Sequence, residues 1–307
     1  MKVGKNDIEF KYQVFIMLAF VFALFLFYDY YLINQKMKPA VAVLMFHSVD
    51  PKGPSGKEEN GVIITPEKLS EQIKYFKSKG YKFIDTNQLI DRVSNPISNE
   101  TNANKNILIT FDDGYRDNYT SAYPILKKEK VSAMINIIAY YVEHPNVAVN
   151  GIHIPNRYLL WSQINEMKKN GIIEVGSHSY NSHYYTELSF GKGPLLVGRR
   201  VKNGMVESDS DFKKRVRMDL LKSMQIIKKR TGDSPQAIAY PYGKAAPETK
   251  SIAKELGFKI QMTVRPGVNS KISDLKNLKR ITVKNNSTPE QIEEQIKFLT
   301  GARHLLP

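Results

Sequence analysis

Two histidines, His178 and His183, lie five residues apart in a polar stretch of a chain that has only six histidines. Neutral imidazole is the commonest metal-binding side chain, and two imidazoles with one carboxylate form an open zinc-type site with room for a water. Their spacing is not the i, i+4 spacing of one helix face, and it suits a strand end followed by a loop. Because polar loop residues would look the same, the pair needs a carboxylate from elsewhere in the chain to indicate a metal site.

Adjacent carboxylates, Asp112 and Asp113, follow an apolar run at residues 106–111 and precede Gly114. Two acids at the end of a buried strand are costly without a cation, although an ordinary Asp-Gly turn has the same letters. Combined with the two histidines, one aspartate would ligate a divalent metal and the other would stay free as a general base. The metal would activate a water and polarise a carbonyl, and the free carboxylate would take the proton of that water.

His47 follows a third apolar run, at residues 41–46. A leaving amine needs a proton, and His47 is the candidate acid because it ends a separate strand. The ligand set of two histidines and one aspartate suits Zn²⁺, and also Co²⁺, Ni²⁺ or Fe²⁺. These residues together predict a metal-dependent hydrolase.

Apolar runs that read as buried strands alternate with segments of helical periodicity. Strands are expected at residues 41–46, 106–111, 132–138, 172–177, 236–241 and 258–264. Helices are expected at residues 66–79, 119–129, 161–169, 211–229 and 247–256. Residues 94–105 and 189–210 are expected to be irregular. The alternation predicts an α/β fold with a parallel sheet covered by helices or closed into a barrel, and functional residues at the strand ends.

The N-terminal region carries an uncharged apolar run at residues 14–28, which continues past Asp29. It approaches the ~20 apolar residues of a spanning helix, with tyrosines at the interfaces. No small-x-small site follows to favour a cleaved signal peptide, and a buried core helix is the other alternative. The expected order is a signal-anchor at residues 1–33, with membrane contact over 12–33, a linker at 34–40 and a catalytic domain at 41–307.

The amino-acid composition excludes several kinds of site and of binding partner. The absence of cysteine excludes disulfides, thiolate zinc sites and lipid-modified cysteine anchors. A net charge of +15 fits either a solvated lysine-rich surface or attraction to lipid headgroups and acidic wall polymer. The lysines are spread along the chain without a nucleic-acid-binding motif, so no nucleic-acid partner is expected.

These motifs resemble those of the polysaccharide deacetylases of carbohydrate esterase family 4, the NodB-homology domain, over about residues 40–300. TFDDG at residues 110–114 matches the first motif, which implies Asp112 as the base and Asp113 as a ligand. HSYNSH at residues 178–183 resembles the second motif, which implies both of its histidines as ligands. AYPYG at residues 239–243 matches the third motif, which implies the backbone N–H of Tyr242 as the oxyanion donor.

One subgroup of that family is especially similar. The five-residue histidine spacing and MFHSVD at residues 45–50 resemble the poly-β-1,6-N-acetylglucosamine deacetylases of biofilm matrices, of the intercellular-adhesin type, where the histidine matching His47 is a proposed acid. The resemblance implies a distorted (β/α)7 barrel and an N-deacetylase that releases acetate from an extracellular N-acetylglucosamine polymer. It also implies a single-pass cell-membrane protein with its domain outside, or else a secreted protein retained at the cell surface. Association with a polysaccharide synthesis machinery is a further expectation.

Two alternatives remain open. Within enzymes, the alternative is a peptidoglycan N-acetylglucosamine deacetylase. From another class, the alternative is an inactive membrane-tethered glycan-binding module, which would have no need of a free base beside a metal.

The sequence also departs from the wider family. Ala239 stands where an arginine often tethers the base, and LKRITV at residues 278–283 replaces the late Leu-x-His motif. The second change places more weight on His47 as the acid. Arg280 is expected to form a surface or structural ion pair, with the orientation of a carboxylate as the alternative. Tyr184 and Tyr185 are candidate sugar contacts, whereas Trp161 is expected to pack.

Overall fold

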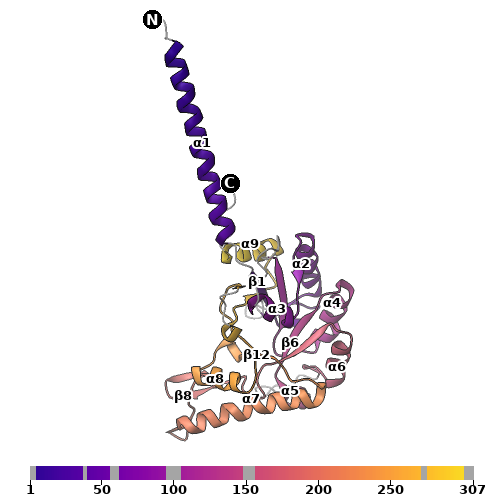
Figure 1. Cartoon of the computed structure of the whole chain (residues 1–307). Coiled ribbons are helices and arrows are strands. Elements are labelled where there is room, and N and C mark those ends of the chain that lie inside the picture. The colour runs from indigo at the N-terminus through magenta and orange to yellow at the C-terminus, as the bar shows by residue number, and fades with distance from the viewer. Residues whose placement is uncertain are drawn as a thin grey trace.

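Parallel strands form the centre of the fold, with helices packed around them (Figure 1). The structure, a computed structural model, describes residues 5–36, 40–55, 62–94, 105–147, 156–270 and 275–300. The parallel strands are β1 (Ala40–Phe46), β5 (Asn106–Phe111), β6 (Ala133–Ile137), β7 (Ile173–Ser177), β12 (Ala237–Ala239), β13 (Ile260–Met262) and β15 (Ile281–Thr282). Every strand predicted from the apolar runs is present.

The order of neighbouring strands is β13, β12, β7, β6, β5, β1 and β15. Leu278, just before β15, forms an isolated parallel bridge with Met262 of β13, so the two ends of the sheet approach each other. Two short strands pair at the edges, β4 (Lys82–Phe83) with β5 and β14 (Asn269–Ser270) with β1. The predicted parallel α/β sheet is thereby confirmed, in the form of a curved half-barrel.

Both faces of these strands are buried, which explains their continuously apolar sequences. Alternate residues point to opposite sides. One set forms an inner cluster, made of Val41, Val43, Leu108, Met134, Ala237, Ala239, Ile260, Met262 and Leu278 together with Ile84 and Leu89. The other set, such as Leu44 and Ile109, packs against the surrounding helices. A residue that lies two positions after an inner-cluster residue on the same strand therefore also points to the inner face.

Helices α2, α6, α7 and α8 occupy predicted segments, and the segment 119–129 is a π-helical turn followed by α4. Helices α3, α5 and α9 were not predicted. The bounds are α2 (Pro66–Ser78), α3 (Thr86–Ser94), α4 (Tyr123–Glu129), α5 (Ala139–Glu143), α6 (Trp161–Lys169), α7 (Asp209–Thr231), α8 (Pro247–Glu255) and α9 (Pro289–Leu299). Helix α9 begins with a capping box between Thr288 and Gln291, a signal that the sequence did contain.

The prediction of an irregular stretch at residues 189–210 is wrong. This segment contributes to two antiparallel hairpins, one of β8 (Tyr185–Leu188) with β9 (Gly191–Pro194) and one of β10 (Val201–Lys202) with β11 (Met205–Val206). Asn203 and Gly204 both have positive φ in the second turn, as a two-residue hairpin requires. The Asn-Gly pair was thus a readable hairpin signal. Residues 95–104 of the other expected loop lie outside the described residues.

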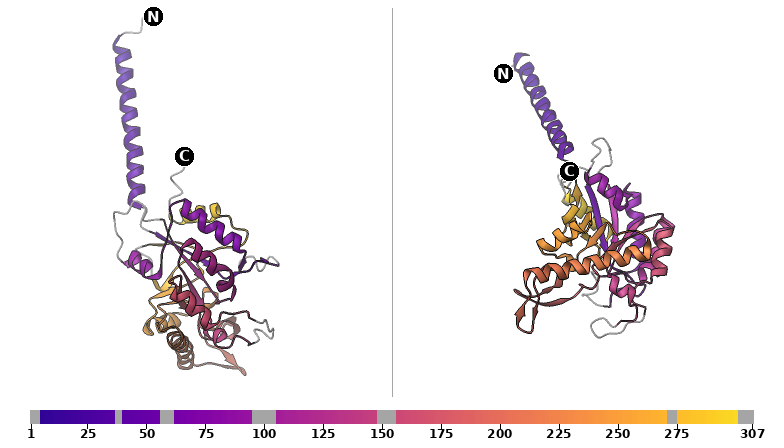
Figure 2. Two further views of the ribbon diagram at one scale, coloured as in Figure 1. Left: turned by 90° about the vertical axis from the view of Figure 1, so that its right-hand side faces the viewer. Right: turned by 60° about the horizontal axis from the view of Figure 1, so that its bottom comes forward.

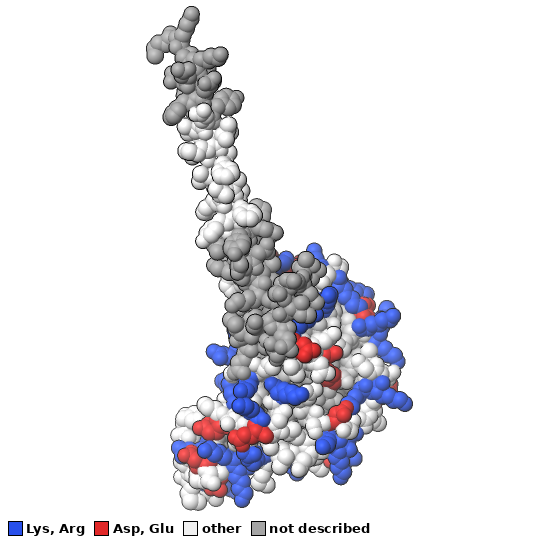
Figure 3. All heavy atoms as spheres, viewed as in Figure 1, with Lys and Arg blue, Asp and Glu red and all other residues white. Residues whose placement is uncertain are grey.

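Helix α1 (Lys5–Lys36) projects away from the sheet and its helices (Figure 2). Its apolar side chains, such as Phe15, Phe20 and Phe27, are 63–70% exposed on different sides of the helix. Its described atoms carry no charge, whereas lysines, arginines and acids are interspersed over the rest of the face in Figure 3. Within the part of the chain that the structure describes, no helix is both long and apolar enough to cross a membrane.

Helix α9 is held to α2 and the following turn by one buried carboxylate. Glu293 accepts hydrogen bonds from the hydroxyls of Tyr75 at 2.9 Å and Tyr81 at 3.4 Å. Lys297 lies 3.2 Å from the same carboxylate. Burial alone would raise the pKa of Glu293, but Tyr75 and Lys297 hold it below its ordinary value.

Glu293→Ala is expected to lower the free energy of unfolding by about 1–3 kcal/mol, because a tyrosine hydroxyl loses its buried acceptor. The lowered pKa gives a pH signature: the stabilisation is present above the ordinary glutamate pKa and is lost as pH falls through the folded-state value. Urea unfolding at pH 7 and below pH 4.5 measures both effects. The control is Glu294→Gln, an exposed neighbour, and equal stability of both variants would contradict this role.

Candidate metal centre and active site

The polar motifs gather where the parallel strands end. His47 follows β1, Asp112 and Asp113 follow β5, and His178 follows β7. Tyr242 lies in the 3-10 turn after β12. Because neighbouring parallel strands end on the same edge, side chains that are far apart in the sequence meet there.

Asp113 faces both predicted histidine ligands. Its Oδ1 atom lies 3.4 Å from Nε2 of His178 and 3.3 Å from Nε2 of His183. This oxygen is buried and has no hydrogen-bond partner among the described residues. Bonds of about 2.1 Å to a tetrahedral ion would separate the ligand atoms by roughly 3.4 Å. An orphaned carboxylate oxygen that faces two imidazole nitrogens at this spacing therefore fits a divalent cation.

The orientation of His178 is set by the strands beside it. Its Nδ1 lies 2.7 Å from the carbonyl oxygen of Ala239, which can only accept, so Nδ1 carries the proton and Nε2 presents a lone pair. Burial would lower the pKa of His178, but the carboxylates of Asp113 and Asp112 raise it. Burial lowers the pKa of His183, which favours the neutral ligand form.

Asp112 belongs to a separate network, in which the ion pair expected of Arg280 is buried and also orients a carboxylate. The fully buried Arg280 guanidinium donates to both carboxylate oxygens of Asp112, at 2.9 and 2.7 Å, and its Nε donates to the carbonyl of Thr263 at 2.8 Å. Burial alone would raise the pKa of Asp112, but Arg280 and His178 lower it to about 2. Arg280 thus orients the carboxylate, which is ionised at neutral pH and is not part of the Asp113 cluster.

Asn136 is a site residue that the sequence reading missed. Its side-chain amide donates to Oδ1 of Asp112 at 2.8 Å. A Cβ at Gly176 of the adjacent strand would lie 2.1 Å from Oδ1 of Asn136, so only glycine leaves room for this amide. The available signal was a single polar residue inside the apolar run 132–138, two positions from the inward-facing Met134.

His47 lies next to Asp112 on the neighbouring strand end, since the backbone N–H of Asp112 donates to the carbonyl of Phe46 at 2.9 Å. Its backbone carbonyl accepts a hydrogen bond from the Asn118 amide at 2.7 Å. Its buried Nδ1 has no partner among the residues described. The ring is therefore held next to the site with an imidazole nitrogen uncommitted.

Tyr242 has the positive φ of 57°, which is uncommon for a non-glycine residue. Asp113 and Ser179 share this feature, each with φ of 72°. Such backbone conformations cost free energy and concentrate at functional sites. The Tyr242 ring packs 4.4 Å from the His183 ring and 4.7 Å from the Tyr185 ring, measured between centroids.

The aromatic rim beside His183 is exposed, as a sugar-binding surface requires. Tyr184 and Tyr185 are 38% and 45% exposed. Trp161, in contrast, packs against the core and donates its indole N–H to Glu143 at 2.6 Å, which matches the packing role expected for it.

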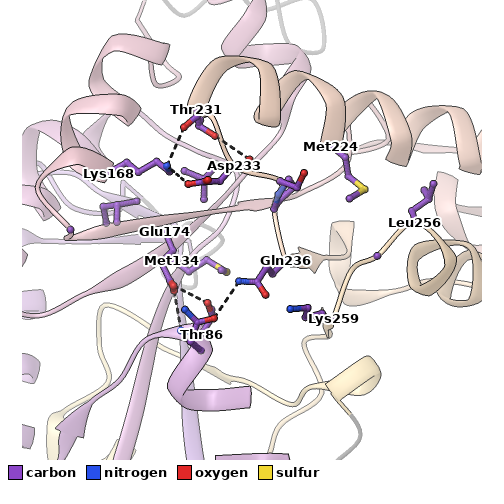
Figure 4. A pocket seen from close by; sticks show the side chains of 17 residues that line it. Thr86, Met134, Lys168, Glu174, Met224, Thr231, Asp233, Gln236, Leu256 and Lys259 are labelled. Atoms are coloured by element: carbon purple, nitrogen blue, oxygen red, sulfur yellow. Dashed lines mark hydrogen bonds and ion pairs between the residues drawn. The ribbon is translucent and has the colours of Figure 1, made fainter. Parts of the chain in front are cut away.

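A cavity of about 820 Å³ lies at the opposite ends of the strands (Figure 4). It is lined by Ile173 and Glu174 at the start of β7, and by Gln236 and Lys259 just before β12 and β13. Glu174 accepts from the backbone N–H of Thr86 at 3.0 Å and from its hydroxyl at 2.8 Å, so it caps helix α3. The cavity is therefore separate from the metal centre, which lies where the strands end.

Arg280→Met is expected to lower the free energy of unfolding at pH 7 by about 3–5 kcal/mol, because it leaves Asp112 as an uncompensated buried charge. The pKa of Asp112 should rise above its ordinary value, since burial then dominates. Carboxyl ¹³C NMR titration measures the pKa, and denaturant unfolding measures the stability. The control Arg265→Met removes an exposed arginine two residues beyond Thr263. An unchanged Asp112 pKa would contradict the tether.

Comparison with known proteins agrees with these features. A 24% identical relative from Escherichia coli strain K12, named poly-beta-1,6-N-acetyl-D-glucosamine N-deacetylase, aligns over 82% of this chain, and the chain spans only 38% of that relative's length. A relative of the same name from Staphylococcus epidermidis is 24% identical, with 85% of this chain and 86% of the relative covered. The structure of IcaB from Ammonifex degensii is 26% identical, with a TM-score of 0.66 over 84% of this chain and 97% of that one.

The sequence model of the polysaccharide deacetylase family matches residues 99–261, which is more than half of the chain. The matched region contains the Asp112–Asp113 pair, both histidines and the turn around Tyr242. The chain therefore belongs to the polysaccharide deacetylase family.

Proposed function

We propose that this protein is a metal-dependent N-deacetylase of an extracellular N-acetylglucosamine polymer, with poly-β-1,6-N-acetyl-D-glucosamine as its substrate. One observation carries the proposal. Asp113 presents an unpartnered oxygen to two imidazole nitrogens, while its neighbour Asp112 is held outside that cluster by Arg280. A ligand set beside a separate, ionised carboxylate is what hydrolysis by an activated water needs.

Asp113, His178 and His183 would hold the metal, and Zn²⁺ is the ion we favour for two imidazoles and one carboxylate. When bound, a divalent ion in this position would lower the pKa of a water and polarise the amide carbonyl. Co²⁺, Ni²⁺ and Fe²⁺ suit the same donors. Elemental analysis of the protein purified without added metal identifies the ion.

Asp112 is the proposed general base. Its carboxylate is ionised at neutral pH, and Arg280 and Asn136 fix its orientation. It accepts the proton of the attacking water while the water oxygen bonds to the amide carbon. The amide C–N bond then breaks, and acetate and a free amine leave.

His47 and Tyr242 complete the proposed reaction. The uncommitted imidazole of His47 beside Asp112 supports its role as the acid that protonates the leaving amine. The strained turn at Tyr242 supports a backbone N–H directed at the oxyanion. Because these groups lie on different strands, the reaction depends on their common edge.

The substrate proposal has two supports. The relatives from E. coli and S. epidermidis carry the name of a poly-β-1,6-N-acetylglucosamine deacetylase. The exposed rings of Tyr184 and Tyr185 beside His183 offer flat apolar surfaces on which sugar rings can stack. Peptidoglycan is the competing substrate, so both glycans belong in the same assay.

Asp112→Asn is expected to lower acetate release from β-1,6 N-acetylglucosamine oligomers by about 10²–10⁴-fold and to leave metal affinity intact, because it removes the base and keeps the three proposed ligands. A chelator should abolish the wild-type activity, and added Zn²⁺ should restore it. Asp91→Asn, an exposed acid on α3, is the control. Faster release from muropeptides would favour the peptidoglycan alternative. Glycan binding without metal-dependent release would favour an inactive binding module.

We further propose that residues 1–33 attach the protein to the cell membrane as a single-pass anchor, with the domain outside the cell. The support is the uncharged apolar run at residues 14–28 and the exposure of its side chains on all sides of α1. An outside domain would meet the polymer as it emerges, in association with a polysaccharide synthesis machinery.

Removal of residues 1–36 is expected to move the protein from the membrane fraction to the soluble fraction while acetate release is retained. High-salt washing separates this attachment from adsorption through the net charge of +15. A matched variant, Leu18→Lys with Phe22→Lys, keeps the length and adds charges that cost about 2.5–3.5 kcal/mol each at the centre of a span. Sedimentation of the truncated chain with membranes would contradict the anchor, and a mature protein lacking the segment would indicate secretion.

A further inference from the structure

The loop between the two imidazole ligands, residues 179–182, has all four of its backbone N–H groups bonded. Ser179 N–H donates to the Ser177 hydroxyl at 3.1 Å, and Ser182 N–H donates to the Ser179 hydroxyl at 3.0 Å. The N–H groups of Tyr180 and Asn181 both donate to the carboxylate of one residue outside the loop. The path of the loop is therefore set from outside as well as from within.

That outside residue is Asp219 in the middle of helix α7. Its Oδ2 accepts from Tyr180 N–H at 2.9 Å, and its Oδ1 accepts from Asn181 N–H at 2.9 Å. Among the residues described, no lysine or arginine lies within ion-pair distance of Asp219, and its carboxylate is met by the two backbone N–H groups and the Ser182 hydroxyl. The carboxylate thus acts as a two-oxygen clamp on consecutive N–H groups.

Two further side chains of α7 contact the same region. The Ser223 hydroxyl lies 2.7 Å from the Ser177 hydroxyl, which in turn accepts from the loop. The ammonium of Lys222 lies 4.0 Å from the centroid of the Tyr180 ring. Lys222 and Ser223 lie three and four residues after Asp219, so all three side chains are on the same side of the helix. Helix α7 therefore presents a continuous support to the loop.

The other side of the loop is bonded as well. Its carbonyls at Ser179 and Tyr180 accept from the first N–H groups of α5, Ala139 at 3.3 Å and Tyr140 at 2.9 Å. Ser179 meanwhile has φ of 72°, a conformation that needs such support. The loop is thus held between α5 and α7, and a shift of its centre would move His183 relative to His178.

We propose that Asp219, assisted by Ser223, is the positioning residue that sets the distance between the two histidine ligands and thereby the metal affinity of the site. The assignment rests on the proposed metal-dependent function. Asp219 lies on a different element from every proposed ligand and makes no contact with the reacting groups. It acts through the four-residue loop 179–182. Because two of its backbone N–H groups are bonded to Asp219, the loop brings both Nε2 atoms to the same Asp113 oxygen.

The test is the Zn²⁺ affinity of Asp219→Asn in the full-length protein in detergent, measured by competition with a chromophoric chelator. Asparagine keeps the shape but turns one acceptor into a donor that faces an N–H. The Kd for Zn²⁺ should rise about 10–100-fold, as for other residues that orient metal ligands. Acetate release should recover when Zn²⁺ exceeds the new Kd, and the melting temperature of the metal-free variant shows separately how far folding is affected.

Val216→Ala is the matched control, because it trims a fully buried apolar side chain of the same helix that packs in a cluster with Phe212 and Leu220. It should lower the melting temperature of the metal-free protein and leave the Kd unchanged. If Asp219→Asn does not fold, the Kd for Zn²⁺ is measured on Ser223→Ala instead. A smaller but measurable rise in this Kd is expected.

An Asp219→Asn protein, or in its place a Ser223→Ala protein, with the wild-type Kd would overturn the assignment and leave the proposed function standing. A wild-type protein that binds none of Zn²⁺, Co²⁺, Ni²⁺ or Fe²⁺ would instead overturn the proposed function. The two failures are thus separated by the wild-type measurement alone.

Discussion

Burial of two adjacent carboxylates is the constraint on which the rest of the site depends. Asp112 and Asp113 are 2% and 6% exposed, and charges so placed are strongly destabilising unless they are compensated. The charge of Asp112 is compensated within the protein, because Arg280 donates a hydrogen bond to each of its two oxygens. Among the residues that the structure describes, Asp113 pairs with two imidazoles, and its Oδ1 has no hydrogen-bond donor. The two adjacent aspartates thereby acquire different roles. The charge of Asp112 is compensated within the protein, and the charge of Asp113 would be compensated by a bound cation.

The geometry of the site is assembled from strained turns that distant elements hold in place. Asp113, Ser179 and Tyr242 each adopt a positive φ, at a cost of order 1–3 kcal/mol per residue. Each lies just beyond the end of a different parallel strand. Gly243, next to Tyr242, would place a Cβ 2.5 Å from the backbone nitrogen of Val264, so the third turn is packed directly against the next segment. Such turns persist because the surrounding sheet and helices over-determine them.

Local signals were sufficient for much of the fold. Continuous apolar runs predicted the central strands because both faces of a covered parallel sheet are buried. Helices α2, α6, α7 and α8 followed from apolar spacing and end signals. The hairpins at residues 185–206 and the capping box of α9 were missed although Asn203-Gly204 and Thr288–Gln291 carried readable signals. Both elements were therefore predictable from local sequence signals.

By itself the sequence determined which residue types stand at the strand ends, since that depends only on local periodicity and motif spacing. It therefore indicated Asp112, Asp113, His178 and His183 as one group. Only the tertiary structure decided what supports them, because those partners come from elsewhere in the chain. Arg280 reaches Asp112 across 168 residues, Asn136 across 24, and Asp219 reaches the histidine loop from another helix. No local pattern encodes such pairings, because they follow from strand order and from the packing of one helix against one turn.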